Sequence, residues 1–319
     1  MPLPEETINI GELQVILNKF ETYKVSYPLF PKFQLFESNF EEDGYKVRIS
    51  APDFNRQLEK YEEFQEELPN YPDFRECFLT SGCITYTNVE EFQEKLKFYR
   101  GLHRKVYFAL DTNILYHCFV SRSSMRDEKV LIAPTVKEEI RGAMNYKYSR
   151  QDLCEFKSKI KFQSELVDEL LNGRKKKSRK AAYLAQNELK KLHSLSVEEI
   201  EFNVTEYERN DLKIIRELKN FERKNNVLVV FLTADRILED LCEIEGLEYF
   251  LFHYPDRLET FQCTPSTFRS LLYTLAVVFG FIKLNSVIIF GEFRGKTQLD
   301  TLKIRFLDEK IFKECQRDL

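Results

Sequence analysis

The chain has 319 residues, more than one hydrophobic core usually organises, so we expect two or three domains. Its 43% hydrophobic residues are enough to give each domain a core. The most apolar run, residues 271–282, is shorter than the roughly 20 residues of a membrane span, and the first ten residues lack the basic and apolar character of a leader. Composition therefore argues against a membrane protein and predicts a cytoplasmic one.

Cysteine and histidine are arranged in a way that argues against disulfide frameworks and zinc sites. The seven cysteines are scattered, odd in number and contain no C-x-x-C pair. The four histidines are far apart, and no two have the i, i+4 spacing of a zinc hydrolase. Any bound metal is therefore expected to have oxygen ligands.

The net charge of −4 conceals an uneven distribution. Residues 1–100 contain 19 acidic and 11 basic side chains, whereas the rest of the chain contains 33 acidic and 37 basic ones. Six of the seven residues from 174 to 180 are cationic: Arg174, Lys175, Lys176, Lys177, Arg179 and Lys180. Such a run is either a solvated helix face or a surface for a polyanion such as a nucleic acid.

Residues 1–103 are predicted to form an α+β domain of unknown role. Residues 45–50 alternate like a strand, while residues 52–68 and 88–100 have helical spacing, with Asn88 as the cap of the second helix. The many aromatic side chains of this region are expected mostly in its core, with base stacking as the alternative. No catalytic motif is found in this part of the sequence.

Residues 104–254 alternate between strands and helices, which is the pattern of a parallel sheet. The expected strands cover residues 106–110, 130–133, 199–204, 227–232 and 249–253, and the expected helices begin near residues 113, 134, 211 and 236. A long helical insertion separates the second helix from the third strand. The first and fourth strands are continuously apolar, as expected of strands that are covered on both faces. This region is therefore predicted to be an α/β domain.

Acidic residues stand where the strands of this domain end. Asp111 follows the first strand and Asp235 the fourth, so neighbouring parallel strands would present two carboxylates at the edge where α/β sheets bind ligands. Glu138 and Glu139 lie in the first turns of the second helix, and Asp211 opens the third. Each acid by itself could simply cap a helix or complement its dipole. The pairing of Asp111 with Asp235 favours a site.

Taken in order, these landmarks resemble the PIN-domain nucleases. The resemblance rests on Asp111-x-Asn113 after an apolar strand, Glu139-Ile140 after a strand and a proline, Asp211 before an apolar helix stripe, and T-x-D at residues 233–235. It implies an acidic quartet of Asp111, Glu139, Asp211 and Asp235, with Asn113 and Thr233 as polar neighbours that orient ligands or the attacking water. Glu138 in place of Glu139, and Glu208 in place of Asp211, stay open as alternatives.

The resemblance also implies a chemistry. Four clustered carboxylates need cations to offset their repulsion, and a set of oxygen ligands selects Mg²⁺ or Mn²⁺. One or two such ions, the pair lying about 4 Å apart, activate water and stabilise the departing oxygen in phosphodiester hydrolysis. The family implies RNA as the substrate and products with 5′-phosphate and 3′-hydroxyl ends, whereas a single strand fits a site that must reach a phosphate without lifting a duplex. Endonucleolytic cutting is expected, exonucleolytic cutting stays open as the alternative, and the cationic run at 174–180 is expected to hold the strand. A homodimer or a ribonucleoprotein partner stays open.

Residues 255–319 are predicted to form a small α+β domain. An apolar helix over residues 268–281 leads into a hairpin of residues 287–293 and 301–308, whose tip carries Arg294 and Lys296. The two cations are expected to belong to a soluble turn, with phosphate contact as the alternative. The surrounding sequence FGEFRGKT lacks the spacing of a nucleotide-binding loop.

The full expectation is thus a PIN-like parallel-sheet domain, a β-α-β sandwich, between an α+β N-terminal domain and a small α+β C-terminal domain. A haloacid-dehalogenase-like phosphatase also begins with a strand and an Asp, but it requires a second Asp where this chain has Asn113. The remaining alternative is a non-catalytic RNA-binding or assembly protein on a PIN scaffold. The presence of all four acids weighs against that alternative and favours a metal-dependent ribonuclease.

Overall fold

The computed structural model describes residues 4–42, 44–50, 52–125, 127–192, 194–196 and 210–318. Its contacts group the chain into two compact units. The first contains Met1–Ile84, Met144–Tyr183 and Arg257–Leu319, and the second contains Thr85–Ala143 and Leu184–Asp256. No helix among the described residues has both the length and the apolar character needed to cross a bilayer.

The second unit is built on a five-stranded parallel sheet in the order β7-β6-β5-β8-β9. Its strands are β5 (Val106–Leu110), β6 (Val130–Ile132), β7 (Ser194–Ser196), β8 (Leu228–Thr233) and β9 (Glu248–Leu251). The predicted α/β class and its parallel sheet are confirmed. The strand expected at residues 199–204 lies outside the described residues.

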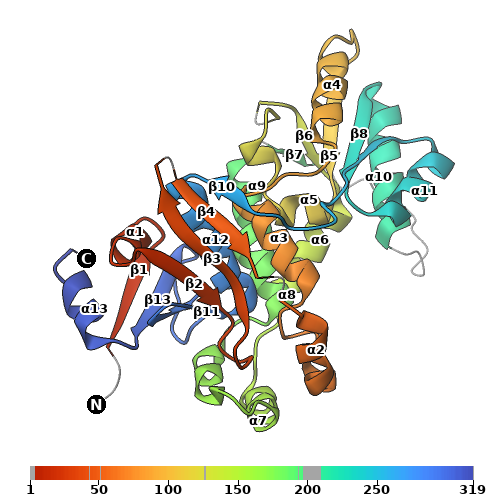
Figure 1. The fold of residues 1–319 in the computed structure, drawn as a ribbon. Coiled ribbons are helices and arrows are strands. Elements are labelled where there is room, and N and C mark those ends of the chain that lie inside the picture. Colours follow the sequence, from red (N-terminus) through yellow and green to blue (C-terminus); the bar gives the residue numbers. More distant parts are fainter. Residues whose placement is uncertain are drawn as a thin grey trace. The chain divides into compact units, whose positions relative to one another are not determined.

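Helices follow the strands of this sheet, as the alternating sequence pattern predicts. They are α4 (Val89–Arg100), α5 (Thr112–Tyr116), the short 3-10 helix η2 (Val120–Arg122), α6 (Pro134–Ala143), α9 (Gln186–Lys191), α10 (Asn210–Asn225) and α11 (Arg236–Glu245). Ile214, Ile215 and Leu218 form the buried stripe of α10, which lies beside β8 in Figure 1. The central strands are buried on both faces, which explains their continuous apolar runs.

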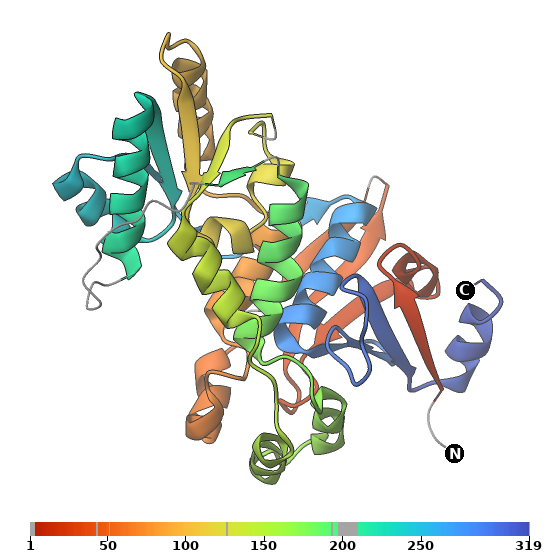
Figure 2. The ribbon, with the colours of Figure 1, turned by 180° about the vertical axis from the view of Figure 1, so that it is seen from behind.

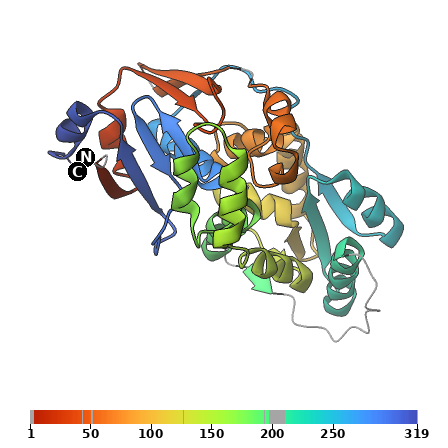
Figure 3. The ribbon, with the colours of Figure 1, turned by 90° about the horizontal axis from the view of Figure 1, so that it is seen from below.

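The first unit is organised around an eight-stranded antiparallel sheet in the order β1-β13-β12-β11-β2-β3-β4-β10. Its strands are β1 (Glu5–Asn9), β2 (Thr22–Ser26), β3 (Gln34–Glu41), β4 (Gly44–Ile49), β10 (Phe261–Cys263), β11 (Phe281–Leu284), β12 (Val287–Phe290) and β13 (Thr301–Phe306). The apolar helix α12 (Pro265–Phe279) packs across these strands, as the view from behind in Figure 2 shows. The first and last strands of the chain, β1 and β13, pair with each other and lie side by side in Figure 3.

This sheet differs from the expectation of separate domains at residues 1–103 and 255–319. Strands from both regions alternate within one sheet, and Arg305 Nε donates to Glu5 Oε1 at 2.7 Å across the β1–β13 pair. The predicted helix at residues 88–100 is α4, which belongs to the other unit because Phe92 packs on Phe250 and Phe252. Pairing between distant strands leaves no local signature in the sequence, so the predicted boundaries follow chain order.

The remaining helices of the first unit are short. They are α1 (Leu13–Leu17), α2 (Phe54–Leu58), the 3-10 helix η1 (Glu59–Phe64), α3 (Tyr71–Ser81), α7 (Arg150–Lys159), the 3-10 helix η3 (Ser164–Leu170), α8 (Lys176–Arg179) and α13 (Glu309–Cys315). A π-helix, η4 (Lys180–Ala185), follows α8. The single helix expected over residues 52–68 is broken, because the backbone of Tyr61 leaves the helical region.

The C-terminal hairpin forms as predicted, since β12 and β13 pair in antiparallel register. The preceding helix ends at Phe279 rather than residue 281. Gly280 has φ +90°, a conformation that suits glycine and stops the helix, and Phe281 then begins β11. The chain therefore has one more strand here than the sequence predicts.

Candidate active site

Asp111 lies at the carboxyl end of the central strand β5, between β6 and β8. It occupies the N-cap position of α5, but its side chain makes no capping bond. Instead its Oδ2 atom accepts hydrogen bonds from Thr233 Oγ1 at 3.0 Å and from Asn113 Nδ2 at 3.4 Å. The carboxylate is 5% exposed. A buried acid at the ligand-binding edge of a parallel sheet is therefore held by two neighbours rather than used as a helix cap.

The surroundings of Asp111 disfavour its charged form. Burial raises the pKa of this carboxyl group to about 7, and the nearby charges of Asp235 and Glu139 add to that increase. The hydrogen bond from Thr233 acts in the opposite direction, as does one from the backbone of Thr112. The electrostatic coupling shows that Asp111, Glu139 and Asp235 share one neighbourhood. A cation placed among them would offset both the burial penalty and the repulsion.

Thr233 links the ends of the two central strands. Its hydroxyl group donates to Asp111 and accepts from the backbone N–H of Asp235 at 3.0 Å. The Asp235 carboxylate caps α11, with Oδ1 accepting from the Ile237 N–H at 2.9 Å. Helix capping is the simple alternative role for both aspartates. Asp235 caps a helix in this way and Asp111 does not. Asp235 Oδ2 has no part in the cap.

Glu139 approaches the same sheet edge from α6. Its Oε2 accepts from Thr112 Oγ1 at 2.7 Å, and its Oε1 accepts from Asn210 Nδ2 at 3.0 Å. Glu138 instead extends outward, with its side chain 66% exposed and paired to Lys213 at 3.6 Å. Glu139 rather than Glu138 is therefore the glutamate of the cluster.

Asp211 follows Asn210 in the first turn of α10 and is partly buried. The alternative acid in its place, Glu208, lies outside the described residues. Asn210 carries the side chain that contacts Glu139, so the start of α10 reaches this cluster. The sequence marks Asn210 only as a helix cap.

Two further contacts tie the elements of this domain together and carry little signal in the sequence. Thr112 stands between the two polar residues of the Asp-Thr-Asn motif, and its hydroxyl group connects β5 to Glu139. Glu217 accepts from the N–H of Thr135 at 3.2 Å and from its hydroxyl group at 2.8 Å, which ties α10 to α6. Burial raises the pKa of Glu217. A threonine directly after a strand-end aspartate is the signal that could have identified Thr112.

The donor chemistry of the cluster suits a hard divalent cation, because the coupled groups are carboxylates with hydroxyl and amide neighbours. In the described ranges, no group of three or more His, Cys, Asp and Glu side chains is arranged so that it could hold a metal ion. The carboxylates of Glu139 and Asp235 are instead occupied by hydrogen bonds from Thr112, Asn210 and Ile237. The chemistry fits such an ion, and coordination would require these side chains to turn toward Asp111.

The cationic run at 174–180 corrects the expectation of an exposed phosphate-binding surface. Its members are turned into the first unit: Lys176 pairs with Asp73 at 2.8 Å, Lys180 with Asp73 and Glu76, and Lys175 with Asp152. Arg179 is 1% exposed and donates to the carbonyl groups of Arg174, Val277 and Val278. Arg174 donates to the hydroxyl group of Tyr183. Lys177 is the exposed member.

The C-terminal hairpin tip is also less cationic at its surface than the sequence suggests. Arg294 is exposed, but Lys296 donates to the Gly291 carbonyl at 2.6 Å and lies 4.2 Å from the ring centre of Tyr183. Burial lowers the pKa of Lys296 to about 8. This lysine therefore packs in the unit rather than extending toward a ligand.

These observations define an α/β domain with coupled acids at the carboxyl edge of a parallel sheet. Residues 108–252 match the family model described as the PIN domain, so this part of the chain is a PIN domain, a fold that is in general a nuclease fold. No curated protein matches the chain.

Among solved structures, a domain of a functionally unknown protein from Methanocaldococcus jannaschii DSM 2661 is similar to this chain. It is 13% identical, and the match covers 48% of this chain and 94% of that one, with a TM-score of 0.31.

Proposed function

We propose that the chain is a metal-dependent endoribonuclease that hydrolyses phosphodiester bonds of single-stranded RNA and leaves 5′-phosphate and 3′-hydroxyl ends. The observation that supports this most is the buried Asp111 carboxylate, whose pKa is raised by burial and by two neighbouring acids of a PIN domain. Strongly perturbed acids of this kind concentrate at catalytic sites. The choice of RNA over DNA and the product ends rest on the family resemblance, and the single strand rests on the need of the site to reach a phosphate without lifting a duplex.

In this proposal Asp111, Glu139, Asp211 and Asp235 hold Mg²⁺ or Mn²⁺. A bound ion of this type lowers the pKa of its water and offsets charge on the departing oxygen. Thr233 keeps Asp111 oriented through its hydroxyl hydrogen bond, and Asn113 contacts the same carboxylate oxygen. In this proposal Asn113 and Thr233 orient the acid, the phosphate or the attacking water.

Removal of divalent metal should abolish cleavage, since the proposed ligands are carboxylates that repel one another without it, and one of them, Asp111, is buried. The measurement follows cleavage of a labelled single-stranded RNA in Mg²⁺ or Mn²⁺, after addition of excess EDTA, and after metal is restored. The Asp111→Asn protein, purified in parallel, reports any contaminating nuclease. Cleavage that persists in EDTA, and is missing from the Asp111→Asn preparation, would contradict the metal requirement.

Glu139→Gln should reduce cleavage by roughly 100-fold, because losing one carboxylate ligand costs about 3 kcal/mol of transition-state stabilisation. Raising the Mg²⁺ concentration should recover part of that loss. The matched control is Glu138→Gln, whose side chain points to solvent and should cleave at the parental rate. The reverse result, with Glu138→Gln inactive and Glu139→Gln active, would transfer the ligand role to Glu138.

The alternative, a non-catalytic RNA-binding protein on a PIN scaffold, predicts RNA binding without cleavage at any metal concentration. Mapping the ends of the cleaved RNA separates the proposed chemistry from other routes. A 5′-phosphate on the downstream fragment agrees with water attack at phosphorus, whereas a 2′,3′-cyclic phosphate would identify attack by the RNA's own hydroxyl group.

A further inference from the structure

Cations gather at the end of the PIN domain opposite the acidic cluster. Three connections enter the amino ends of the neighbouring strands β5, β8 and β6, and each brings exposed positive charge. We call this the amino-edge surface and define it by Arg104 and Lys105 before β5, Arg223 and Lys224 before β8, and Lys129 before β6.

Backbone contacts make the three connections one continuous surface. The Leu228 N–H donates to the Lys105 carbonyl at 2.9 Å, and the Phe108 N–H donates to the Lys129 carbonyl at 2.8 Å. Arg104 Nε donates to the Asn226 carbonyl at 3.4 Å. Because adjacent strands lie about 4.8 Å apart, three neighbouring connections span roughly 10 Å. The cations are therefore clustered in space although they are distant in sequence.

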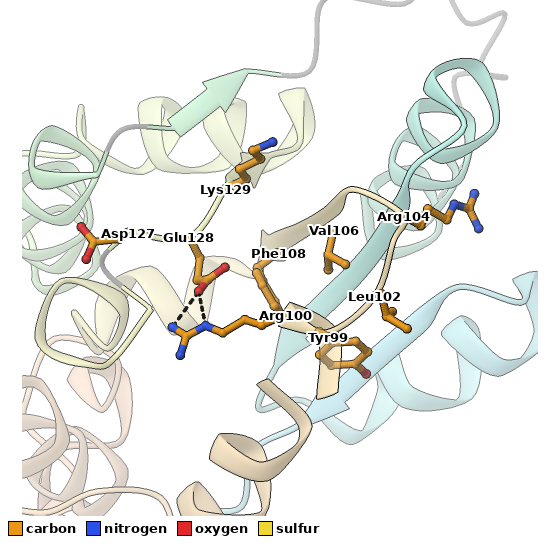
Figure 4. Close-up of a pocket in the computed structure, with 9 residues that line it drawn as sticks. All are labelled: Tyr99, Arg100, Leu102, Arg104, Val106, Phe108, Asp127, Glu128 and Lys129. Atoms are coloured by element: carbon orange, nitrogen blue, oxygen red, sulfur yellow. Dashed lines mark hydrogen bonds and ion pairs between the residues drawn. The ribbon is translucent and has the colours of Figure 1, made fainter. Parts of the chain in front are cut away.

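The charges of this surface are available to a ligand. All five side chains are exposed, and within the part of the chain that the structure describes none of them forms an ion pair. Figure 4 shows Lys129 and Arg104 extending outward on two sides of β5, whereas Arg100 turns to Glu128, which it contacts at 2.7 Å. The acidic charge of Glu128 is thus already matched by Arg100.

An exposed aromatic ring lies at the same end of the domain. Phe98, in the last turn of α4 just before the connection to β5, is 64% exposed, although Phe92, Leu96 and Tyr99 of the same helix are buried. Exposed cations and an exposed aromatic ring at the same end of a domain are the combination with which proteins hold single-stranded nucleic acid, through phosphate contacts and base stacking.

We propose that the amino-edge surface binds the phosphate backbone of single-stranded RNA, with Phe98 stacking on a base. The proposal rests on the proposed ribonuclease function and extends it, because the acidic cluster lies at the other end of β5, about 17 Å away along the strand. A strand held at this surface lies beyond the nucleotides that react. The surface should therefore contribute to binding of long RNA and be dispensable for short RNA.

The experiment compares two triple variants of the full chain in an Asp111→Asn background, so that binding is measured without cleavage. Lys105→Ala/Lys129→Ala/Lys224→Ala removes one cation from each connection. Lys60→Ala/Lys161→Ala/Lys310→Ala removes three exposed lysines of the first unit and is the charge-matched control. Fluorescence anisotropy over a salt series, with oligonucleotides of about 5 and about 30 nucleotides, gives the RNA affinity of each variant. It also gives the salt slope, the slope of log affinity against log salt concentration.

The amino-edge triple should lower affinity for the long RNA and flatten its salt slope by about 2, since each lost single-strand phosphate contact removes roughly 0.7. The control triple should retain the parental slope. Phe98→Ala should weaken long-RNA binding about tenfold without changing the slope, because it removes stacking and no charge. Unchanged affinity and slope in the amino-edge triple would overturn the proposal, as would equal losses in the control.

Cleavage assays with Asp111 intact separate this proposal from the proposed function. If the parent cleaves the short RNA and the amino-edge triple binds long RNA normally, the surface proposal fails and the nuclease stands. If the triple loses long-RNA binding but the parent cleaves nothing in any divalent metal, the nuclease fails and the surface stands. Binding of polyglutamate in preference to RNA, with the same dependence on the triple, would instead assign the surface to an acidic protein partner.

Discussion

Replacing Asp111 with asparagine should abolish RNA cleavage and, in metal-free buffer at pH 8, make the protein more stable than its parent. The loss of activity follows from removing the central carboxylate of the proposed metal site. The gain in stability follows from the same carboxylate's burial, which raises its pKa to about 7 from an ordinary value of 3.8. One substitution should thus move activity and stability in opposite directions.

The sign of the pH dependence follows from proton linkage. Between about pH 4 and pH 7 the folded protein retains a proton on Asp111 that the unfolded chain releases, so the free energy of unfolding falls as pH rises through this window. Above pH 7 the buried Asp111 carboxylate is charged, and the full cost of this charge is present. For a pKa raised by about three units, that cost is about 4 kcal/mol in the free energy of unfolding. Asparagine does not titrate and still offers Thr233 a hydrogen-bond acceptor. The free energy of unfolding of Asp111→Asn should therefore exceed that of the parent most at pH 8, and the two should be equal near pH 4.

The measurement is urea unfolding of both proteins in EDTA at pH 4.5 and pH 8. Asp240→Asn, an exposed aspartate on α11, is the control for removing one negative charge and should change stability little at either pH. If the free energies of unfolding of Asp111→Asn and its parent differed by the same amount at both pH values, Asp111 would titrate normally. Added Mg²⁺ should narrow the difference at pH 8, because metal binding stabilises the parent and not the variant.

The PIN domain could be predicted well because its signals are local. Residues 106–110 were predicted as a strand and form β5 with the same bounds, since a continuous apolar run between a basic connection and a polar motif has few other structures. The positions of Asp111 and Asp235 then follow from parallel pairing, which places both at one sheet edge. The sequence names Glu139 for the quartet and leaves Glu138 open, because it cannot show which of the two side chains turns toward Asp111 and which pairs with Lys213.

The first unit was harder to predict because its partners are distant in sequence. β1 and β13 are both ordinary amphipathic strands, and nothing in either marks the other as its neighbour across almost the whole chain. The expectation that the cationic run at 174–180 holds RNA is wrong for the same reason. Its counter-charges, Asp73 and Glu76, lie about a hundred residues earlier, so a stretch that looks solvated by composition is, apart from Lys177, paired or buried.

Substitution of Arg179 should destabilise the protein as much as substitution almost anywhere in the first unit. Substitution of Lys177, two residues earlier in the same run, should have little effect on stability. Arg179 is 1% exposed and donates to the carbonyl groups of Val277 and Val278, in the last turn of α12, and to that of Arg174. Methionine preserves much of the apolar stem but has no donor. Arg179→Met therefore leaves buried carbonyl groups unsatisfied, and we expect a loss of about 3–5 kcal/mol in the free energy of unfolding.

Lys177→Met is the matched control, because it changes the same kind of side chain in the same helix at an exposed position, and it should stay within about 0.5 kcal/mol of the parent. Urea unfolding of both variants in EDTA measures the difference. If Arg179→Met fails to fold, Arg179→Lys tests the same contacts more gently: one ammonium group cannot replace a planar guanidinium that serves three carbonyl groups, so a partial loss is expected. Equal and small changes in the free energy of unfolding at both positions would contradict the buried role of Arg179. The run would then be a solvated helix face whose cations are available to RNA.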